Sequence, residues 1–422
     1  MSATDYSVPF GRGELRFTLP QDWQVDVATA VPVQPRPPRK LAEEAFAAQV
    51  RRVRQAVIVF TDSTRDSPDD MLAAQAIHDL QTAGMAHDRI RFMCAVGMHR
   101  PSTREEKLRK LGPAQVEAFS VVDHRPEDAV TVGEVDGIPV QVNRALVEPD
   151  TLVIALGVVE PHQYAGYSGG AKTVAIGCGG VDTIAATHSP QMLGREGVRL
   201  GLVDGNPFQR FVRQAAKLTG LVRVYNAVLD ANHRILTWMA GPPEQVHDVL
   251  VQFAQQFTEI PVQAPYDVVI AGVGPPKDVN LYQASRAVTY VALSRAPVIR
   301  QGGTIIMAAP VPEGSGQGTG ERNFFAALSQ TRDLGAMMRR METVGCQPGE
   351  QRAYMVAQTL RVLRVVVVGA GDPEMVRQAH FMPVASMEEA VALAEAHHTA
   401  PDKPLRALIV PNAIQMLPVP VA

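Results

Sequence analysis

The strongest constraint on the fold of this chain is a series of short apolar runs that recur along its length. Examples are 56–60 (AVIVF), 152–158 (LVIALGV) and 363–369 (LRVVVVG). A run of about four to eight apolar residues between polar or glycine-rich segments is typical of a strand buried on both faces. The segments between the runs show helical spacing, as at 281–294. Strands that alternate with helices predict an α/β fold with mainly parallel sheets.

We expect two α/β domains, 1–262 and 263–422, with the active site in the cleft between them; the turn Gln263-Ala264-Pro265 marks the boundary. The expected strands are 56–60, 90–96, 140–143, 152–158, 221–230, 266–271, 303–309, 363–369 and 407–410. The expected helices are 41–54, 68–80 with Ser67 as N-cap, 242–257 and 281–294. A hairpin is expected at 7–20, and an extended proline-rich connector at 32–38.

Composition excludes several classes of protein. The 422 residues carry a formal net charge of −3, which argues against binding to nucleic acid. The three cysteines are widely spaced, so neither a disulfide framework nor a cysteine-based zinc site is expected. The chain has no secretory signal and no apolar run long enough to cross a membrane. We therefore expect a cytoplasmic enzyme or binding protein.

Polar clusters follow three of the expected strands. They are Asp62 to Arg65, His99-Arg100, and the segment from His162 to Lys172. Because the carboxyl ends of parallel strands lie at one edge of a sheet, we expect these clusters to meet there. Any one cluster alone is more typical of helix-capping loops, but three at successive strand ends indicate a functional site.

The third cluster is the richest in chemistry. It runs from His162 through the turn Ser168-Gly169-Gly170 to Lys172, and on to His188. The turn and the lysine approach a phosphate-binding loop, but Ala171 stands where that motif needs its second glycine. On its own this is weak support for phosphate binding.

These side chains suit an enzyme that handles a small anionic substrate. His99 and His162 can act as paired acid and base, and Arg65 can grip a carboxylate with two hydrogen bonds. His188 could be a metal ligand, so a metal or a phosphate-bearing cofactor stays open. The motifs of zinc proteases and serine hydrolases are absent from the sequence.

At this point the chain resembles the nickel-pincer lactate racemase family. The resemblance covers most of the chain and keeps the order of the motifs, and the spacing of His162, Lys172 and His188 is its most specific part. The other motifs that carry it are Phe10 to Leu15, Asp62-Ser63-Thr64-Arg65, Gly97-Met98-His99-Arg100-Pro101 and Tyr282-Gln283-Ala284-Ser285-Arg286.

The resemblance implies a racemase or epimerase of 2-hydroxy acids that uses a nickel-pincer nucleotide, a pyridinium-3,5-bisthiocarboxylic acid mononucleotide. Lys172 would link covalently to this cofactor, His188 would bind the nickel, and other enzymes would make the cofactor. His99 and His162 would exchange the substrate's hydroxyl proton while hydride moves reversibly between its α carbon and the cofactor. The remaining implied contacts are Arg65, Gln283 and Arg286 for the substrate and Asp62, Thr64, Ser168, Gly169 and Gly170 for the nucleotide.

The chain departs from lactate racemases at several positions. Arg286 stands where they carry a lysine, Asp66 where a proline is usual, and Met98 where a threonine is usual. The pocket aromatic that their second domain contributes has only Tyr354 and Phe381 as weak candidates. These departures favour a 2-hydroxy acid other than lactate, either bulkier or with a second carboxylate. The alternatives are a sugar-acid epimerase of the same family, or a phosphate- or nucleotide-binding protein without catalysis.

Overall fold

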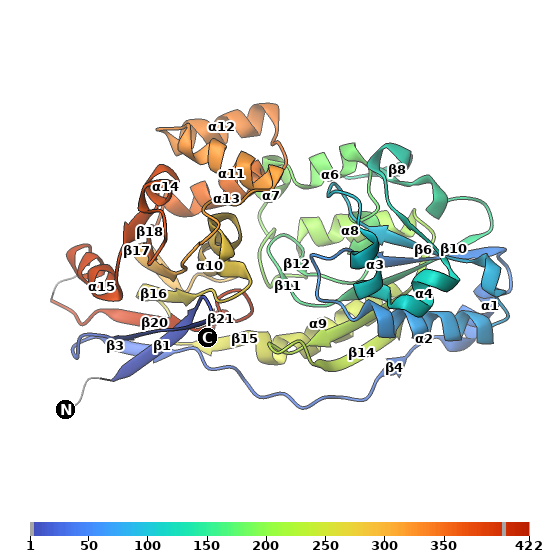
Figure 1. Cartoon of the computed structure of the whole chain (residues 1–422), viewed down its shortest axis with the longest axis horizontal. Coiled ribbons are helices and arrows are strands. Elements are labelled where there is room, and N and C mark those ends of the chain that lie inside the picture. The colour runs from blue at the N-terminus through green and yellow to red at the C-terminus, as the bar shows by residue number, and fades with distance from the viewer. Residues whose placement is uncertain (1–3, 399–401, 422) are drawn as a thin grey trace.

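The computed structural model describes residues 4–398 and 402–421, and it has two α/β domains that lie side by side (Figure 1). This confirms the expected fold class. Among the described residues, no helix is long and apolar enough to cross a membrane.

The first domain is built on a seven-stranded sheet in the order β4-β14-β13-β10-β5-β6-β7. All neighbouring pairs are parallel except β13 and β14. The strands are β4 (Arg39–Lys40), β5 (Gln55–Thr61), β6 (Ile90–Ala95), β7 (Ser120–Asp123), β10 (Thr151–Val158), β13 (Leu221–Leu229) and β14 (Ile235–Gly241). The expected strand at 140–143 lies outside this sheet, because β9 (Ile138–Asn143) forms a separate hairpin with β8 (Ala129–Val135).

Helices cover both faces of this sheet because its central strands β5 and β10 carry apolar side chains on both faces. Ile58 and Ile154 pack with α2, whereas Val57 and Val153 pack with α9 on the other face. The helices of this domain are α1 (Glu43–Val50), α2 (Asp69–Thr82), α3 (Arg104–Leu111), α4 (Pro113–Ala118), α5 (Lys172–Ala175), α6 (Val181–Thr187), α7 (Pro190–Leu193), α8 (Pro207–Lys217) and α9 (Pro243–Thr258). The prediction of Ser67 as the N-cap of α2 is wrong, because its hydroxyl donates instead to the Asp69 carboxylate (2.6 Å).

The second domain has a six-stranded parallel sheet in the order β19-β18-β17-β16-β20-β3. Its strands are β16 (Tyr266–Gly272), β17 (Ile299–Ala308), β18 (Arg364–Val368), β19 (Met382–Val384), β20 (Arg406–Val410) and β3 (Gln24–Val27). Its helices are α10 (Leu281–Ala292), α11 (Thr319–Ser329), α12 (Leu334–Val344), α13 (Glu350–Leu360), α14 (Pro373–Gln378) and α15 (Met387–Ala396).

The start of the chain belongs to this second sheet, which corrects the expectation that 1–262 forms one domain. The hairpin of β1 (Asp5–Phe10) and β2 (Gly13–Thr18) packs Val8 and Phe17 against the second sheet, and β3 is its edge strand. The chain then crosses to the first domain through the connector at 28–38, visible as the long blue segment in Figure 1. The apolar face of the second sheet needs a cover, and the hairpin supplies it together with α15.

Two further contacts tie the domains together. The strand β15 (Glu259–Val262), just before the second domain, pairs in parallel with β21 (Leu417–Pro420) near the C-terminus. One hydrophobic cluster also joins Tyr164 and Ala165 of the first domain to Leu281 and Ala284 of α10. The loop that carries His162 is therefore packed against the helix that carries Arg286.

Candidate functional site

The three polar clusters lie at one edge of the first sheet, as expected. β10, β5 and β6 are parallel neighbours, so their carboxyl ends point the same way. Asp62 follows β5, His99 follows β6 by four residues, and His162 follows β10 by four residues. Sheet order thus brings together side chains that are 37 and 63 residues apart in the sequence, as the expectation of parallel strands requires.

Asp62 and His99 form a carboxylate–imidazole pair. The Asp62 Oδ2 lies 2.7 Å from the Nδ1 of His99, whose side chain is 64% exposed. Since the carboxylate only accepts, Nδ1 carries the proton and Nε2 keeps its lone pair. Burial alone would raise the pKa of Asp62, but hydrogen bonds from His99 and Thr64 and the charge of Arg65 hold it below its ordinary value. This pair therefore presents a base on Nε2 of His99.

His162 lies in the opposite environment. It is 8% exposed, in a short hairpin formed by β11 (Pro161–His162) and β12 (Gly166–Tyr167). Its Nδ1 accepts the backbone N–H groups of Tyr164 and Ala165, both at 3.2 Å, so Nε2 carries the proton. Burial, followed by the charges of Lys172 and Arg65, holds the pKa of His162 well below its ordinary value. His162 is a neutral hydrogen-bond donor, whereas His99 offers an acceptor.

The turn at 168–170 is held by the first domain. Gly169 and Gly170 have φ of +84° and +56°, which glycine adopts far more readily than other residues. The Gly170 N–H donates to Asn226 Oδ1 (2.6 Å), and His247 Nε2 donates to the Ser168 carbonyl (3.1 Å). The Ser168 hydroxyl also donates to a backbone carbonyl, that of Val158 (2.7 Å). The Gly170 N–H and the Ser168 hydroxyl proton are therefore already used inside the protein.

Lys172 begins the short helix α5 beside this turn. Burial, reinforced by the nearby Arg65 charge, lowers its pKa to about 7. About half of the Lys172 amines are therefore unprotonated at pH 7, which makes this lysine a nucleophile at neutral pH. A structural lysine is more often found paired with a carboxylate, as Lys110 is with Asp69 (3.0 Å).

His188 presents one free ring nitrogen. Its Nδ1 lies 3.1 Å from the Ile184 carbonyl, so that nitrogen carries the proton and Nε2 keeps a lone pair. Burial and the Lys172 charge lower the pKa of His188 to about 4, which keeps it neutral as a metal ligand must be. Within residues 4–398 and 402–421, no three His, Cys, Asp or Glu side chains gather closely enough to hold a metal. A metal bound by His188 would need its other ligands from a cofactor.

The amine of Lys172 and the Nε2 of His188 fit the nickel-pincer nucleotide. An unprotonated buried amine can form an amide-type bond, and a neutral imidazole can supply one nickel ligand. The two groups interact electrostatically and so lie close together. The donor set of the chain itself therefore agrees with a cofactor that is tethered at one residue and ligated at another.

Arg65 and Thr64 stand on the same loop as Asp62. Arg65 Nη1 donates to Glu160 Oε1 at 2.9 Å, and its side chain is 30% exposed. The Thr64 hydroxyl donates to Asp62 Oδ1 at 2.6 Å. Arg65 therefore keeps other N–H donors for an anion. Thr64 helps to fix the orientation of the Asp62 carboxylate.

Gln283 and Arg286 reach the site from the second domain on α10. Asn280 caps this helix by accepting the Gln283 N–H at 2.9 Å, which fixes its first turn. The Gln283 Oε1 and the Arg286 Nε are buried and have no hydrogen-bond partner in the described part of the chain. Arg286 interacts electrostatically with His162 and Arg65, so the two domains contribute to one site.

The two aromatic candidates Tyr354 and Phe381 are buried in a large hydrophobic cluster, and the Tyr354 hydroxyl donates to Glu342 (2.8 Å). Tyr282 packs against the same cluster, but it stands one turn before Arg286 on α10 and its ring lies 5.0 Å from the Arg352 guanidinium. Sequence reasoning listed Tyr282 only within a motif, because nothing local distinguishes a site-facing ring from a core ring.

Four further side chains of the site were missed from the sequence. Three support groups already described: Glu160 pairs with Arg65, Asn226 holds Gly170, and His247 holds the Ser168 carbonyl. The fourth is Arg352 of α13, which crosses between the domains to Gln163. Only Glu160 lay near a cluster in the sequence, and the other three lie 56 residues or more from the group they contact.

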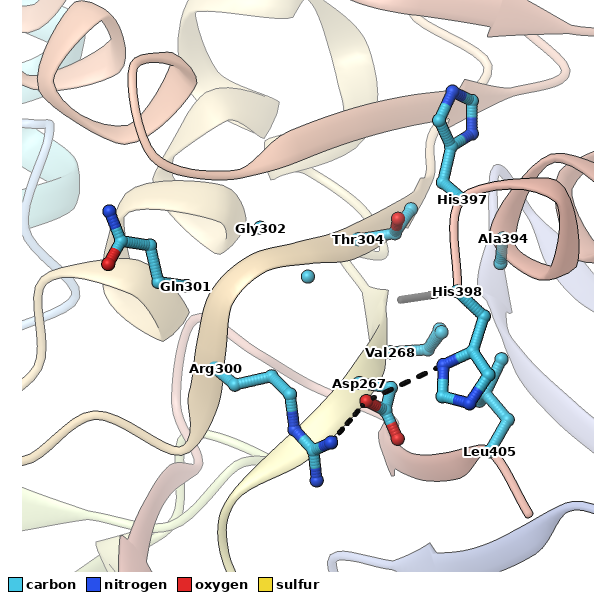
Figure 2. Close-up of a pocket in the computed structure, with 11 residues that line it drawn as sticks. Asp267, Val268, Arg300, Gln301, Gly302, Thr304, Ala394, His397, His398 and Leu405 are labelled. Atoms are coloured by element: carbon cyan, nitrogen blue, oxygen red, sulfur yellow. Dashed lines mark ion pairs between the residues drawn. The ribbon is translucent and has the colours of Figure 1, made fainter. Parts of the chain in front are cut away.

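A separate hollow lies at the amino ends of β16 and β17. Figure 2 shows Asp267 there, between Arg300 at 2.8 Å and His398 at 3.7 Å. The residues that line this hollow include none of the expected site residues. Because Asp267 is already paired with Arg300, we interpret the cluster as structural.

Comparison with known proteins agrees with this geometry. The model of the lactate racemase N-terminal domain matches residues 10–201, and that of the lactate racemase C-terminal domain matches residues 262–417. The lactate racemase of Thermoanaerobacterium thermosaccharolyticum is 26% identical over 92% of this chain and 93% of its own length. That of Lactiplantibacillus plantarum is 29% identical over 81% of this chain and 80% of its own.

Solved structures show the same architecture. The lactate racemase apoprotein from T. thermosaccharolyticum has a TM-score of 0.84 at 25% identity, covering 99% of this chain and all of that one. A protein from Thermotoga maritima has a TM-score of 0.64 at 18% identity, covering 90% and 97%, and shows the fold alone. The two family models together span most of the chain and both of its sheets. The chain therefore belongs to the lactate racemase family, whose named members are isomerases.

Proposed function

We propose that this protein is a racemase or epimerase of a 2-hydroxy acid that works with a nickel-pincer nucleotide. One observation carries the proposal: a buried lysine with a pKa of about 7 lies near a neutral histidine whose Nε2 is free. Lys172 would hold the cofactor covalently and His188 would bind its nickel. When bound, the cofactor supplies reversible hydride transfer at the hydroxyl-bearing carbon.

The chain's own residues would bind the acid and handle its hydroxyl proton. Nε2 of His99 accepts a proton and Nε2–H of His162 donates a hydrogen bond, so the pair offers an acceptor and a donor for the substrate oxygen. The hydrogen bond between Asp62 and Nδ1 of His99 holds the ring so that Nε2, the acceptor nitrogen, points away from Asp62. Arg65, Gln283 and Arg286 would orient the substrate from both domains.

The substrate need not be lactate. Lactate is the acid in the names of the two relatives, and Arg286 replaces the lysine of lactate racemases at a substrate position. An arginine grips a carboxylate with two parallel hydrogen bonds, whereas a lysine acts as a point charge. We further propose a cytoplasmic location, which the three free cysteines favour, and dependence on cofactor-making enzymes.

Mass spectrometry tests the cofactor. The protein would be co-expressed with cofactor-making enzymes and analysed as intact chain and peptides, alongside nickel analysis. We expect one cofactor-sized adduct on Lys172 and about one nickel per chain; Lys172→Arg is the matched variant that keeps a charge but cannot form the bond. An unmodified Lys172, under conditions that load a known lactate racemase, would favour the non-catalytic nucleotide-binding alternative.

A substrate panel tests the reaction. The loaded enzyme would be offered single enantiomers of lactate, longer 2-hydroxy acids, 2-hydroxy dicarboxylic acids and sugar acids, with the products resolved by chiral chromatography. Conversion of simple 2-hydroxy acids supports the proposal. Conversion of sugar acids alone would make the protein a sugar-acid epimerase of the same family.

A further inference from the structure

Arg352 is a buried charge with no counter-charge. It is 2% exposed on α13. Its Nη2 donates to Gln163 Oε1 at 2.8 Å, and its guanidinium lies 5.0 Å above the Tyr282 ring. Its Nε and Nη1 are buried and have no hydrogen-bond partner within the described residues. Two N–H donors of this side chain are therefore available for a ligand.

A second guanidinium lies close to it. Arg286 projects from α10 one turn after Tyr282, and its Nε is also buried without a partner. Across residues 4–398 and 402–421, neither arginine forms an ion pair with an acidic side chain. Burial, with the Arg352 charge as the next cause, lowers the pKa of Arg286. The two cations repel each other, and no acidic side chain of the described residues pairs with either of them.

A purely structural role does not explain this arrangement. The other large buried arginine, Arg223, stacks on Phe46 in the same way, but it also pairs with Glu43 and donates to the Leu41 carbonyl. Burying an unpaired charge is costly, and such groups are rare unless a ligand completes them. The amide of Gln163 and the ring of Tyr282 satisfy only part of Arg352. A carboxylate, which carries a negative charge and two acceptor oxygens, would supply what these buried donors lack.

The residues that contact Arg352 lie next to the proposed substrate contacts, which indicates that its ligand is the substrate. Gln163, its hydrogen-bond partner, follows His162 directly, and Tyr282 precedes the proposed substrate contact Gln283 directly. Arg65 is a separate cation on the first domain, beside Glu160. An acid with a single carboxylate can bind at only one of these two positions, whereas a second carboxylate would supply the anion that Arg352 and Arg286 lack within the described residues.

We propose that Arg352, together with Arg286, binds the second carboxylate of a 2-hydroxy dicarboxylic acid, while Arg65 binds the carboxylate next to the hydroxyl-bearing carbon. This inference rests on the proposed function and names its substrate class. A guanidinium donates strong hydrogen bonds to carboxylate oxygens, and the buried Nε and Nη1 of Arg352 are two donors, on different edges of the group, that have no partner within the described residues. Arg352 is thus a specificity-determining residue of the second domain.

The test uses malate and lactate as probes. With loaded enzyme, kcat/KM would be measured for one enantiomer of each acid in the wild type, in Arg352→Gln and in Arg406→Gln. Arg406 is the matched control, because its guanidinium also lies 5.1 Å above a tyrosine ring, that of Tyr266, in the same domain. We expect the ratio of malate to lactate to fall about tenfold or more in Arg352→Gln, as loss of a charge-assisted pair implies, and to stay unchanged in Arg406→Gln.

A second measurement does not depend on turnover. Thermal unfolding of the cofactor-free chain would be followed with and without malate, using lactate at equal ionic strength as reference. We expect malate to raise the melting temperature of the wild type more than lactate does, and Arg352→Gln to remove that difference. A structural role for Arg352 predicts instead that the variant melts at a lower temperature in every buffer, with the difference between malate and lactate preserved.

The outcomes separate this inference from the proposed function. An enzyme that racemises lactate but neither binds nor converts malate overturns the inference and leaves the proposed function standing. Loss of the Lys172 adduct in Arg352→Gln would assign Arg352 to the nucleotide phosphate and also overturn it. A loaded enzyme that converts no 2-hydroxy acid, while malate still stabilises the cofactor-free chain through Arg352, removes the proposed function and keeps the dicarboxylate site.

Discussion

The two histidines proposed to exchange the hydroxyl proton differ in what holds them. His99 is exposed and bonded to the Asp62 carboxylate, whereas His162 is buried and accepts two backbone N–H groups. The Asp62 carboxylate accepts the Nδ1 proton of His99, whereas Nδ1 of His162 accepts from its two N–H partners and carries no proton. The site therefore has an acceptor on one side and a donor on the other before any substrate arrives.

Two different roles are possible for Asp62: contact with the nucleotide and orientation of His99. The family resemblance assigns it to the nucleotide, but its Oδ2 is bonded to His99. We expect Asp62→Asn to lower kcat of the loaded enzyme about tenfold to a hundredfold, because a neutral amide orients His99 less strongly, and to leave the Lys172 adduct intact. Loss of the adduct in mass spectra of this variant would instead place Asp62 on the nucleotide.

Asp62 should not set the acid limb of the activity. Hydrogen bonds from His99 and Thr64 hold its pKa below the ordinary value, so the carboxylate stays ionised as pH falls from 8 to 5. We expect the activity of Asp62→Asn to keep an acid limb in that range, because the group that titrates there is not Asp62. An acid limb that disappears in the variant would contradict this assignment.

Lys172 should be the most reactive lysine at neutral pH. Its pKa of about 7 leaves about half of it unprotonated at pH 7, whereas an ordinary lysine near 10.4 is less than about 0.1% unprotonated. Trace acetylation of the cofactor-free chain from pH 5 to 9, followed by peptide mass spectrometry, should show labelling of Lys172 that rises with a midpoint near 7. Lys217, which is largely exposed, is the internal reference. A midpoint of Lys172 equal to that of Lys217 would refute the assignment.

At the scale of elements, the glycine turn is fixed by contact with the helix α9. A Cβ on Gly170 would lie 3.1 Å from three atoms of His247 on α9, at a φ of +56°. We expect Gly170→Ala to lower the free energy of unfolding by about 2 kcal/mol or more, from backbone strain plus this contact. Gly205→Ala is the control, because Gly205 has a φ of +73° and nothing within 4 Å of its added Cβ.

A double-mutant cycle isolates the contact between the two elements. In the His247→Ala background the contacts with the imidazole ring vanish while the contact with the Cβ remains, so the Gly170→Ala penalty should fall part of the way towards the cost seen at Gly205. Urea unfolding of the four proteins in the cycle gives the interaction energy. Strict additivity would mean that α9 does not hold the turn.

At the scale of the whole molecule, the second domain depends on the start of the chain. Val8, Phe17 and Trp23 cover one face of its sheet, and β3 completes its edge. We expect a fragment of 262–422 to lack cooperative unfolding and dispersed amide signals, because that apolar face would meet water. Adding residues 4–28 as a separate segment should restore both. A well-folded 262–422 fragment would show that the second domain does not need the hairpin for its stability.

The sequence by itself determined eight strands of the two main sheets, the helices α1, α2, α9 and α10, and the three polar clusters. These depend on local signals: apolar runs, helical spacing, and turn residues such as those before Lys172. The shared edge of the three clusters also followed, because parallel strands leave all their carboxyl ends on one side.

Only the tertiary structure decided which distant groups complete each part of the site. Asn226 and His247 hold the glycine turn, the N-terminal hairpin joins the second sheet, and Arg352 reaches across to Gln163 from 189 residues away. No local pattern announces such contacts, because a hydrogen bond or a buried face is satisfied by whichever segment the sheet order brings near. The missing counter-charge of Arg352 is likewise visible only once its surroundings are known, since burial is what makes an unpaired cation costly.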